Sequence, residues 1–160
     1  MLVGVWEENE GIGAAVEAGI RRAGGRLVTG RHPAELAEQG LDLLAVSPGA
    51  RGWAGAGAIP CRTVLLPGGV GALARHPRAE QAVSYGTSPR DTITFSSLEG
   101  DRLCLALQRE LVTLTGTVVE QQELVVPCPS GPSPLPTLAA AGILLLAGLP
   151  PEALPGLLGA

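Results

Sequence analysis

The chain of 160 residues contains no lysine, so all eleven of its basic residues are arginines. A phosphate-binding loop of the G-x-x-x-x-G-K-[ST] type needs a lysine to contact the β and γ phosphates, and Schiff-base chemistry needs a lysine amine. The absence of lysine therefore excludes both mechanisms.

Aromatic residues are almost as scarce, at 2% of the chain, and the only tyrosine and phenylalanine share one stretch, SYGTSPRDTITFSS (residues 84–97). Its second half alternates large apolar residues with threonine and serine, which is typical of a strand with one buried face. The stretch predicts a turn that leads into a strand. We expect the first residues, among them Tyr85, Thr87 and Ser88, to lie on a ligand-facing edge.

The cysteine and histidine residues are not spaced as disulfide, zinc or catalytic sites usually require. Cys61, Cys104 and Cys128 are far apart and form no C-x-x-C pair, which argues against a disulfide framework or a zinc site. They fit small core residues in a reducing cytoplasm. His32 and His76 each precede a proline, a pattern that fits a helix entry and a helix end better than catalysis.

The charge and the apolar runs limit the partners. A net charge of −4 argues against nucleic acid, which is bound through a basic face. No basic segment precedes an apolar run at the N-terminus, so we expect no secretory signal. The apolar residues 138–149 would reach about 18 Å as a helix, well short of a bilayer core of about 30 Å. We expect a cytoplasmic protein without metal or cofactor, the alternative being membrane attachment through residues 135–160.

Strand and helix signals alternate through the first 88 residues. Apolar positions at helical spacing follow short apolar runs, and glycines close the segments. The alternation predicts a doubly wound, mostly parallel, Rossmann-like α/β sheet in a single domain. We expect strands at 1–6, 26–30, 41–49, 62–69 and 81–86, and helices at 11–25, 32–40 and 70–76.

After Ser88 the pattern changes to residues that alternate between two faces. Gly100 and Gly116 mark turns between these runs, so residues 89–160 should begin as an antiparallel β extension of the sheet. A Pro-rich turn at 130–136 then leads to an apolar C-terminal helix at 137–148. Pro151 starts a last short helix.

The segment WEENEGIGAAV (6–16) approaches the dinucleotide fingerprint G-x-G-x-x-G. Val16 occupies the third small position, and Glu7, Glu8 and Glu10 stand where the pyrophosphate would lie. Three carboxylates would repel two phosphates. The segment therefore predicts a helix start rather than a nucleotide site.

A second glycine turn, LLPGGVGALA (65–74), lies between a strand and a helix, where backbone amides can form an anion-binding nest, although such glycines commonly serve the turn itself. In doubly wound sheets, ligands bind beyond the carboxyl ends of the strands. That rule brings nine candidate ligand-binding residues to one edge: Trp6, Glu7, Ser47, Gly49, Gly68, Gly69, Tyr85, Thr87 and Ser88. A further polar cluster of Arg109, Glu110 and Glu123 is an alternative to simple solvated strand faces.

Several segments resemble the Mur ligases, the peptidoglycan amino-acid ligases. LDLLAVSPGA (41–50) with AIPCRTVLL (58–66) is similar to their UDP-binding N-terminal region. VLLPGGVGALARHPRAEQAVSYGTS (64–88) and LPTLAAAGILLLAGLPPEAL (135–154) are similar to the later part of their central domain, with Ala-Gly-Leu-Pro at 147–150 in place of Leu-Gly-Leu-Pro.

The departures from this family concern its catalytic parts. The phosphate loop, the carbamylated lysine and the Asn-rich or Asp-Asp-Pro step are missing, and LPGGV (66–70) stands in place of the last. The 160 residues also hold no counterpart of the C-terminal ligase domain. The resemblance therefore implies a related sheet and crevice without ATP-driven ligation.

We expect a non-catalytic cytoplasmic α/β module, a reduced Mur ligase-like protein. It should bind a partner protein or a small anionic ligand at the strand C-terminal edge, and it should form a homo-oligomer through its apolar tail or an edge strand. The alternatives are a small lysine-free enzyme that uses Glu7, Asp91 or Glu110 as acid or base, and the membrane-attached protein described above.

Overall fold

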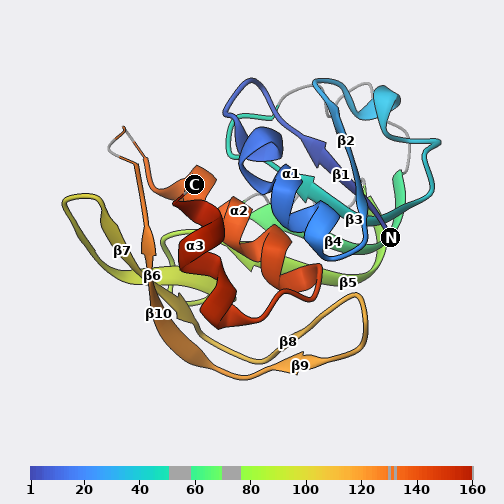
Figure 1. The fold of residues 1–160 in the computed structure, drawn as a ribbon. Helices are drawn as coiled ribbons and strands as arrows, with labels where there is room; N and C mark the ends of the chain where they lie inside the picture. Colours follow the sequence, from blue (N-terminus) through green and yellow to red (C-terminus); the bar gives the residue numbers. More distant parts are fainter. Residues whose placement is uncertain (51–58, 70–76, 130, 132, 160) are drawn as a thin grey trace.

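The computed structural model describes residues 1–50, 59–69, 77–129, 131 and 133–159. These residues form one large sheet, a small β-hairpin and a set of helices (Figure 1). The strands are β1 (Leu2–Trp6), β2 (Arg26–Gly30), β3 (Leu41–Val46), β4 (Ile59–Pro67), β5 (Pro77–Tyr85), β6 (Ile93–Glu99), β7 (Arg102–Leu107), β8 (Leu111–Val112), β9 (Val118–Val119) and β10 (Gln122–Pro127). The helices are α1 (Ile12–Arg22), α2 (Leu135–Leu146) and α3 (Leu154–Leu158), with 3₁₀ turns η1 (Pro33–Glu35) and η4 (Pro151–Ala153).

The large sheet has the strand order β2-β1-β3-β4-β5-β6-β7-β10. The pairs from β2 to β6 are parallel, and β7 and β10 extend the sheet with antiparallel pairs. The predicted class, a mostly parallel Rossmann-like sheet with a C-terminal antiparallel extension, is confirmed. β2 lies on one side of β1 and β3 on the other, so the strand order reverses between β1 and β3. This is the topological switch point of the sheet.

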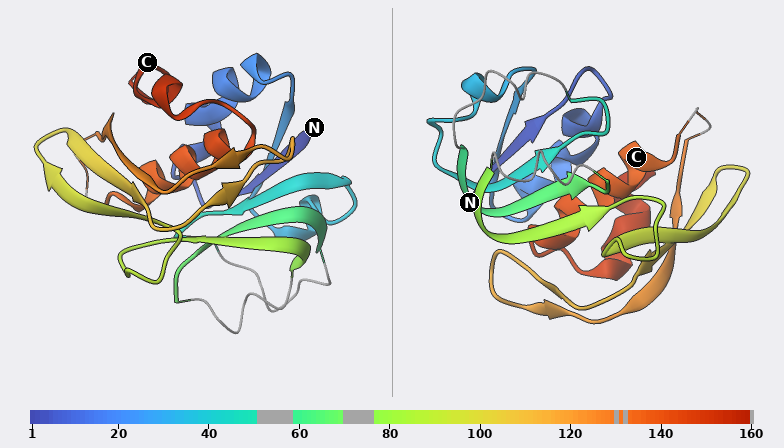
Figure 2. Two further views of the ribbon diagram at one scale, coloured as in Figure 1. Left: turned by 90° about the horizontal axis from the view of Figure 1, so that it is seen from below. Right: turned by 180° about the vertical axis from the view of Figure 1, so that it is seen from behind.

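Helices α1, α2 and α3 gather on one face of the sheet (Figure 2). Helix α2 is apolar on all sides, and its residues from Leu138 to Leu146 are all buried. A helix without a polar face is stable only inside a core, and here the sheet, α1 and α3 enclose it. In the described part of the chain, none of the helices is long and apolar enough to cross a membrane.

The opposite face of the sheet has a separate, smaller core. Trp6, Leu44 and Val64 point to this side from β1, β3 and β4, and Leu36 packs on them from the residue after η1. Apolar side chains thus project from both faces of the central strands and are buried on each side. This explains the unbroken apolar runs in the sequences of these strands.

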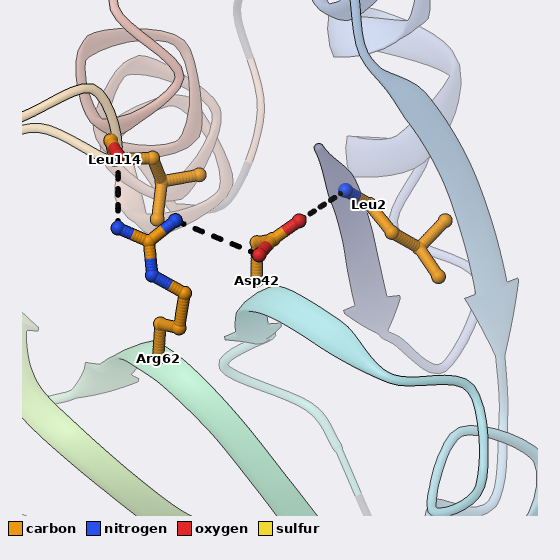
Figure 3. Close-up of polar contacts among 4 residues, drawn as sticks. All are labelled: Leu2, Asp42, Arg62 and Leu114. Carbon is orange, nitrogen blue, oxygen red and sulfur yellow. Dashed lines mark hydrogen bonds and ion pairs between the residues drawn. The ribbon is translucent and has the colours of Figure 1, made fainter.

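An arginine links the β8–β9 hairpin to the amino ends of the central strands (Figure 3), beside a hydrogen bond from the Gln81 side chain to the Val112 carbonyl at 3.2 Å. The Arg62 guanidinium donates to the Leu114 carbonyl at 3.0 Å and lies 3.6 Å from the Asp42 carboxylate. Asp42 accepts a hydrogen bond from the Leu2 amide at 2.8 Å. This chain of contacts joins β1, β3, β4 and the hairpin at one edge of the sheet.

We predict that an Arg62→Ala substitution loosens the hairpin and leaves the sheet intact. Because the ion pair is half exposed, the loss should be about 1 kcal/mol, mainly the hydrogen bond to Leu114. Amide hydrogen exchange of Thr113 and Thr117 should then be about fivefold faster. Arg21→Ala, which breaks only an exposed pair with Glu17, is the matched control. Unchanged exchange at the hairpin would contradict the role assigned to Arg62.

Several expected elements differ in extent. The helix expected at 32–40 is only the 3₁₀ turn η1, although His32 does stand at its N-cap position, as expected of a helix entry. Pro77 is the first residue of β5. The apolar helix starts two residues early, at Leu135, because Pro136 falls in its first turn, where a missing amide proton costs nothing. The helix expected at 70–76 lies outside the described residues.

Candidate functional site

The carboxyl ends of β1 and β3 meet at the switch point, where open α/β sheets bind their ligands. β1 ends at Trp6 and β3 at Val46, and the Ser47 amide donates to the Trp6 carbonyl at 2.9 Å. The loop after β1 therefore lies beside the loop after β3. Two of the predicted ligand-binding residues, Ser47 and Gly49, are brought to this point.

The carboxylate of Glu10 fills the switch point. It accepts hydrogen bonds from the Ser47 hydroxyl at 2.6 Å, the Gly49 amide at 2.9 Å and the Glu8 amide at 2.9 Å. Such donors, converging on two oxygens, are the arrangement that commonly binds an anionic ligand. Here the chain's own side chain takes the position of that ligand.

Glu7 plays the same part at the start of α1. Its carboxylate accepts from the Gly13 amide at 3.1 Å, in the first helical turn, where a dinucleotide-binding protein would hold a pyrophosphate. Glu7 is thus a helix-capping residue in this structure. One of the acidic residues that interrupt the fingerprint in the sequence, Glu7, thus occupies an amide donor of the helix start in the fold.

A third carboxylate, Asp91, lies at the ends of β4 and β5. It is 5% exposed and accepts from the Ser88 amide at 3.1 Å. A Cβ atom built on Gly86 would lie 2.5 Å from Asp91 Oδ2, and one built on Gly68 would also collide with this carboxylate. The glycines are needed because the buried carboxylate approaches their backbone. The Gly68 amide is also used, since it donates to the Tyr85 carbonyl at 2.7 Å.

The two aromatic residues predicted at the edge lie beneath it. Trp6 and Tyr85 are both 0% exposed. The Trp6 indole donates to the Arg31 carbonyl at 3.0 Å, and the Tyr85 hydroxyl donates to the Val46 carbonyl at 2.5 Å. Burial raises the pKa of Tyr85 far above its ordinary value near 10, and the charge of Glu10 raises it further. Both rings support the strand ends from inside the core.

The remaining predicted residues are placed in turns. Thr87 is exposed, Ser88 is half-buried and accepts from the Arg90 amide at 3.1 Å, and Gly69 has a φ of 82° in the turn after β4. A glycine suits that left-handed position because other residues are strained there.

The predicted polar cluster does not assemble. The Arg109 guanidinium donates to the Arg90 carbonyl at 2.7 Å, and within the described residues no ion pair joins Arg109 to Glu110 or Glu123. Glu110 and Glu123 are exposed. These side chains therefore form solvated surfaces, which was the alternative interpretation of the same residues.

A cleft opens beside Glu10 on the helix side of the strand ends. It has a volume of about 190 Å³. Its walls come from the first turns of α1 and α2, the segment after β10 and the end of α3; they include Glu10, Ile12, Ala15, Thr137, Ala140 and Leu158. Apolar side chains predominate among them, so the cleft could hold a small hydrocarbon group.

Cys128 lies beside the cleft, where its thiol donates to the Thr137 hydroxyl at 3.5 Å, whereas Cys61 lies outside this site. Cys61 is buried on β4, and burial raises the pKa of its thiol to about 11, partly offset by a hydrogen bond with the backbone of Leu44. A thiol with so high a pKa is a poor nucleophile at neutral pH. Across the residues that the structure describes, no three His, Cys, Asp or Glu side chains are grouped so as to hold a metal ion.

Glu10 and Asp91 were not among the predicted ligand-binding residues. Glu10 lies 37 positions from Ser47 in the sequence, so their contact follows from the adjacency of β1 and β3. The available signal was the position of Glu10 just before a helix start, directly ahead of the first glycine of the fingerprint-like segment. Asp91 was considered only as an acid or base.

Comparison with known proteins adds no relationship. No protein-family model matches the sequence, and no curated protein matches it either.

Proposed function

We propose that this chain is a non-catalytic cytoplasmic α/β module that binds a partner at the C-terminal edge of its sheet, as a reduced Mur ligase-like protein would. The observation that carries the proposal is the occupation of the strand-end donors by the chain's own carboxylates. Glu10 holds the donors at the switch point and Glu7 holds an amide of α1. A nucleotide phosphate would have to displace these groups against their negative charge.

The distribution of reactive groups supports binding rather than catalysis. Asp91 is buried behind two glycines, Glu7 caps a helix, and Glu110 lies on an exposed turn. General acid–base catalysis needs a carboxyl group within reach of the substrate, with a second group in a complementary role. These three side chains belong to separate places and form no such pair.

The order of elements supports the Mur ligase-like part of the proposal. β5 ends in the Tyr-Gly step, the β6–β7 hairpin follows, and the Ala-rich helix α2 leads to Ala-Gly-Leu-Pro. A second copy of this chain is a candidate partner, because Leu98 and Val125 are 44% and 50% exposed on the antiparallel extension.

We predict that the wild-type protein neither binds nor hydrolyses nucleotides. In an NMR titration with Mg-ATP and UDP-sugars, the amides of Glu8, Gly13 and Gly49 should not shift at millimolar concentrations, and ATP turnover should equal the buffer background. Glu10→Ala removes the competing carboxylate and should gain weak binding of inorganic phosphate at Gly49.

Glu17→Ala is the matched control, because Glu17 is exposed on α1 and pairs only with Arg21. This variant should gain no phosphate binding. Saturable shifts of the strand-end amides with any nucleotide in the wild type, or measurable ATP hydrolysis, would overturn the proposed function.

A further inference from the structure

The cleft beside Glu10 has the size of a small hydrocarbon group. A dry protein cavity of about 150 Å³ accepts benzene, so a cleft of about 190 Å³ has room for roughly six to eight non-hydrogen atoms. The side chains of Ile12, Ala15, Ala140 and Leu158 line it, together with prolines. These side chains neither donate nor accept hydrogen bonds. They would bind a ligand by covering its apolar surface.

Two of the described residues that line the cleft have polar side chains. Glu10 is the one that carries a charge, and the Thr137 hydroxyl accepts a hydrogen bond from the Cys128 thiol at 3.5 Å. A carboxylate has about four acceptor positions, and the Glu10 oxygens use three of them on the Glu8, Ser47 and Gly49 donors. The donors among the described residues therefore leave one acceptor position of Glu10 for a ligand.

The surrounding charges favour a cationic head group over an anionic one. Glu7 accepts from the Gly13 amide in the first turn of α1, and the Ser133 hydroxyl oxygen accepts from the Leu135 amide at the start of α2. Side-chain oxygen atoms thus already accept hydrogen bonds from backbone amides at the starts of both helices. An anion in the cleft would lie beside Glu10 and be repelled by its charge, whereas a cation would be attracted.

We propose that this cleft is a binding site for a small primary amine, whose compact hydrocarbon group lies between α1 and α2 and whose ammonium donates to Glu10. The inference rests on the proposed function and names a ligand class for its strand-end site. It replaces the small anion expected from the glycine turns with a small cation.

The experiment compares three ligands that share one ring and fit the cleft: cyclopentylamine, cyclopentanol and cyclopentanecarboxylate. Each is titrated into the full-length protein at neutral pH and followed by the amide NMR signals of Gly11, Ile12, Thr137 and Leu158. We expect saturable shifts with cyclopentylamine, with a Kd of about 1 mM for a ligand of this size. Cyclopentanecarboxylate should bind at least about tenfold more weakly, because its charge repels Glu10.

Two variants locate the ligand. Ala15 is exposed on α1 and lines the cleft, so Ala15→Leu should fill the space and abolish binding without disturbing the core. Ala14→Leu, at an exposed position outside the lining, is the matched control and should bind normally. Glu10→Gln should weaken binding of the amine about fivefold or more and leave binding of cyclopentanol unchanged.

The outcomes separate this inference from the proposed function. Equal or stronger binding of the alcohol or the carboxylate, abolished by Ala15→Leu, would overturn the preference for an amine and leave a binding module. Absence of shifts at the cleft with all three ligands, or amine binding that survives Ala15→Leu, would overturn the site itself. The proposed function fails on a different result, nucleotide binding at Glu8, Gly13 and Gly49.

Discussion

Replacing Gly142 with leucine is expected to destabilise the protein by about 3 kcal/mol or more, because α2 touches the sheet at this residue. A Cβ atom at Gly142 would lie 2.9 Å from Leu65 Cδ2 and 2.9 Å from Ile93 Cδ1. Both neighbours are 0% exposed and cannot move into solvent. For a domain of this length, the melting temperature should fall by about 6 to 12 °C in a thermal scan followed by circular dichroism.

The matched control is Gly156→Leu in α3. Gly156 is exposed, and a Cβ atom there would meet nothing within 4 Å. Leucine also has a better helix propensity than glycine, so this variant should be as stable as the wild type or up to about 1 kcal/mol more stable. Equal melting temperatures for the two variants would show that α2 does not approach β4 and β6 as described.

Tyr85 is expected to stay protonated until the protein unfolds in alkali. Burial and the Glu10 charge raise its pKa in the folded state, while an unfolded tyrosine ionises near pH 10. Above about pH 10 the unfolded state therefore binds fewer protons than the folded state, and the free energy of unfolding should fall by up to about 1.4 kcal/mol per pH unit. Below that pH, this contribution to stability is fully present.

The composition of the chain makes the alkaline titration of Tyr85 simple to interpret. Tyr85 is the only tyrosine and the chain has no lysine, so the phenolate absorbance reports one residue and no ammonium side chain titrates in the same range. Cys61, with its pKa raised to about 11 from 9.0, adds a fall in stability that begins near pH 9. Tyr85→Phe should remove the tyrosine part of the slope.

One result of the alkaline titration would contradict this prediction. Phenolate absorbance that develops near pH 10 while the circular dichroism remains that of the folded protein would mean that the Tyr85 hydroxyl is open to solvent. The hydrogen bond to Val46 would then also be in doubt.

Local patterns in the sequence were sufficient for much of the fold. Unbroken apolar runs predicted the parallel strands such as β3, and the alternation after Ser88 predicted β6 and β7, because each pattern follows directly from which faces of a strand are buried. The glycines at 100 and 116 predicted turns, and both have positive φ angles. These features depend on neighbours in sequence.

The candidate site was less predictable, because it depends on contacts between distant segments. The rule for strand ends brought Ser47 and Gly49 to the edge of the sheet where they contact Glu10. It could not tell that Trp6 and Tyr85 point into the core from that edge, since a strand end has an inner and an outer side. The occupation of the donors by Glu10 required the pairing of β1 with β3, which no local pattern encodes.

The packing of α1 against α2 has a consequence for biosynthesis. The two helices share one core, yet α1 is translated well before α2, with the strands of the sheet between them. While the ribosome is still making the strands between them, the apolar side of α1 and of the sheet has no cover. The apolar surface of the nascent chain therefore remains accessible to chaperones until α2 has been translated. A chain truncated before residue 135 would lack α2 and be prone to aggregate.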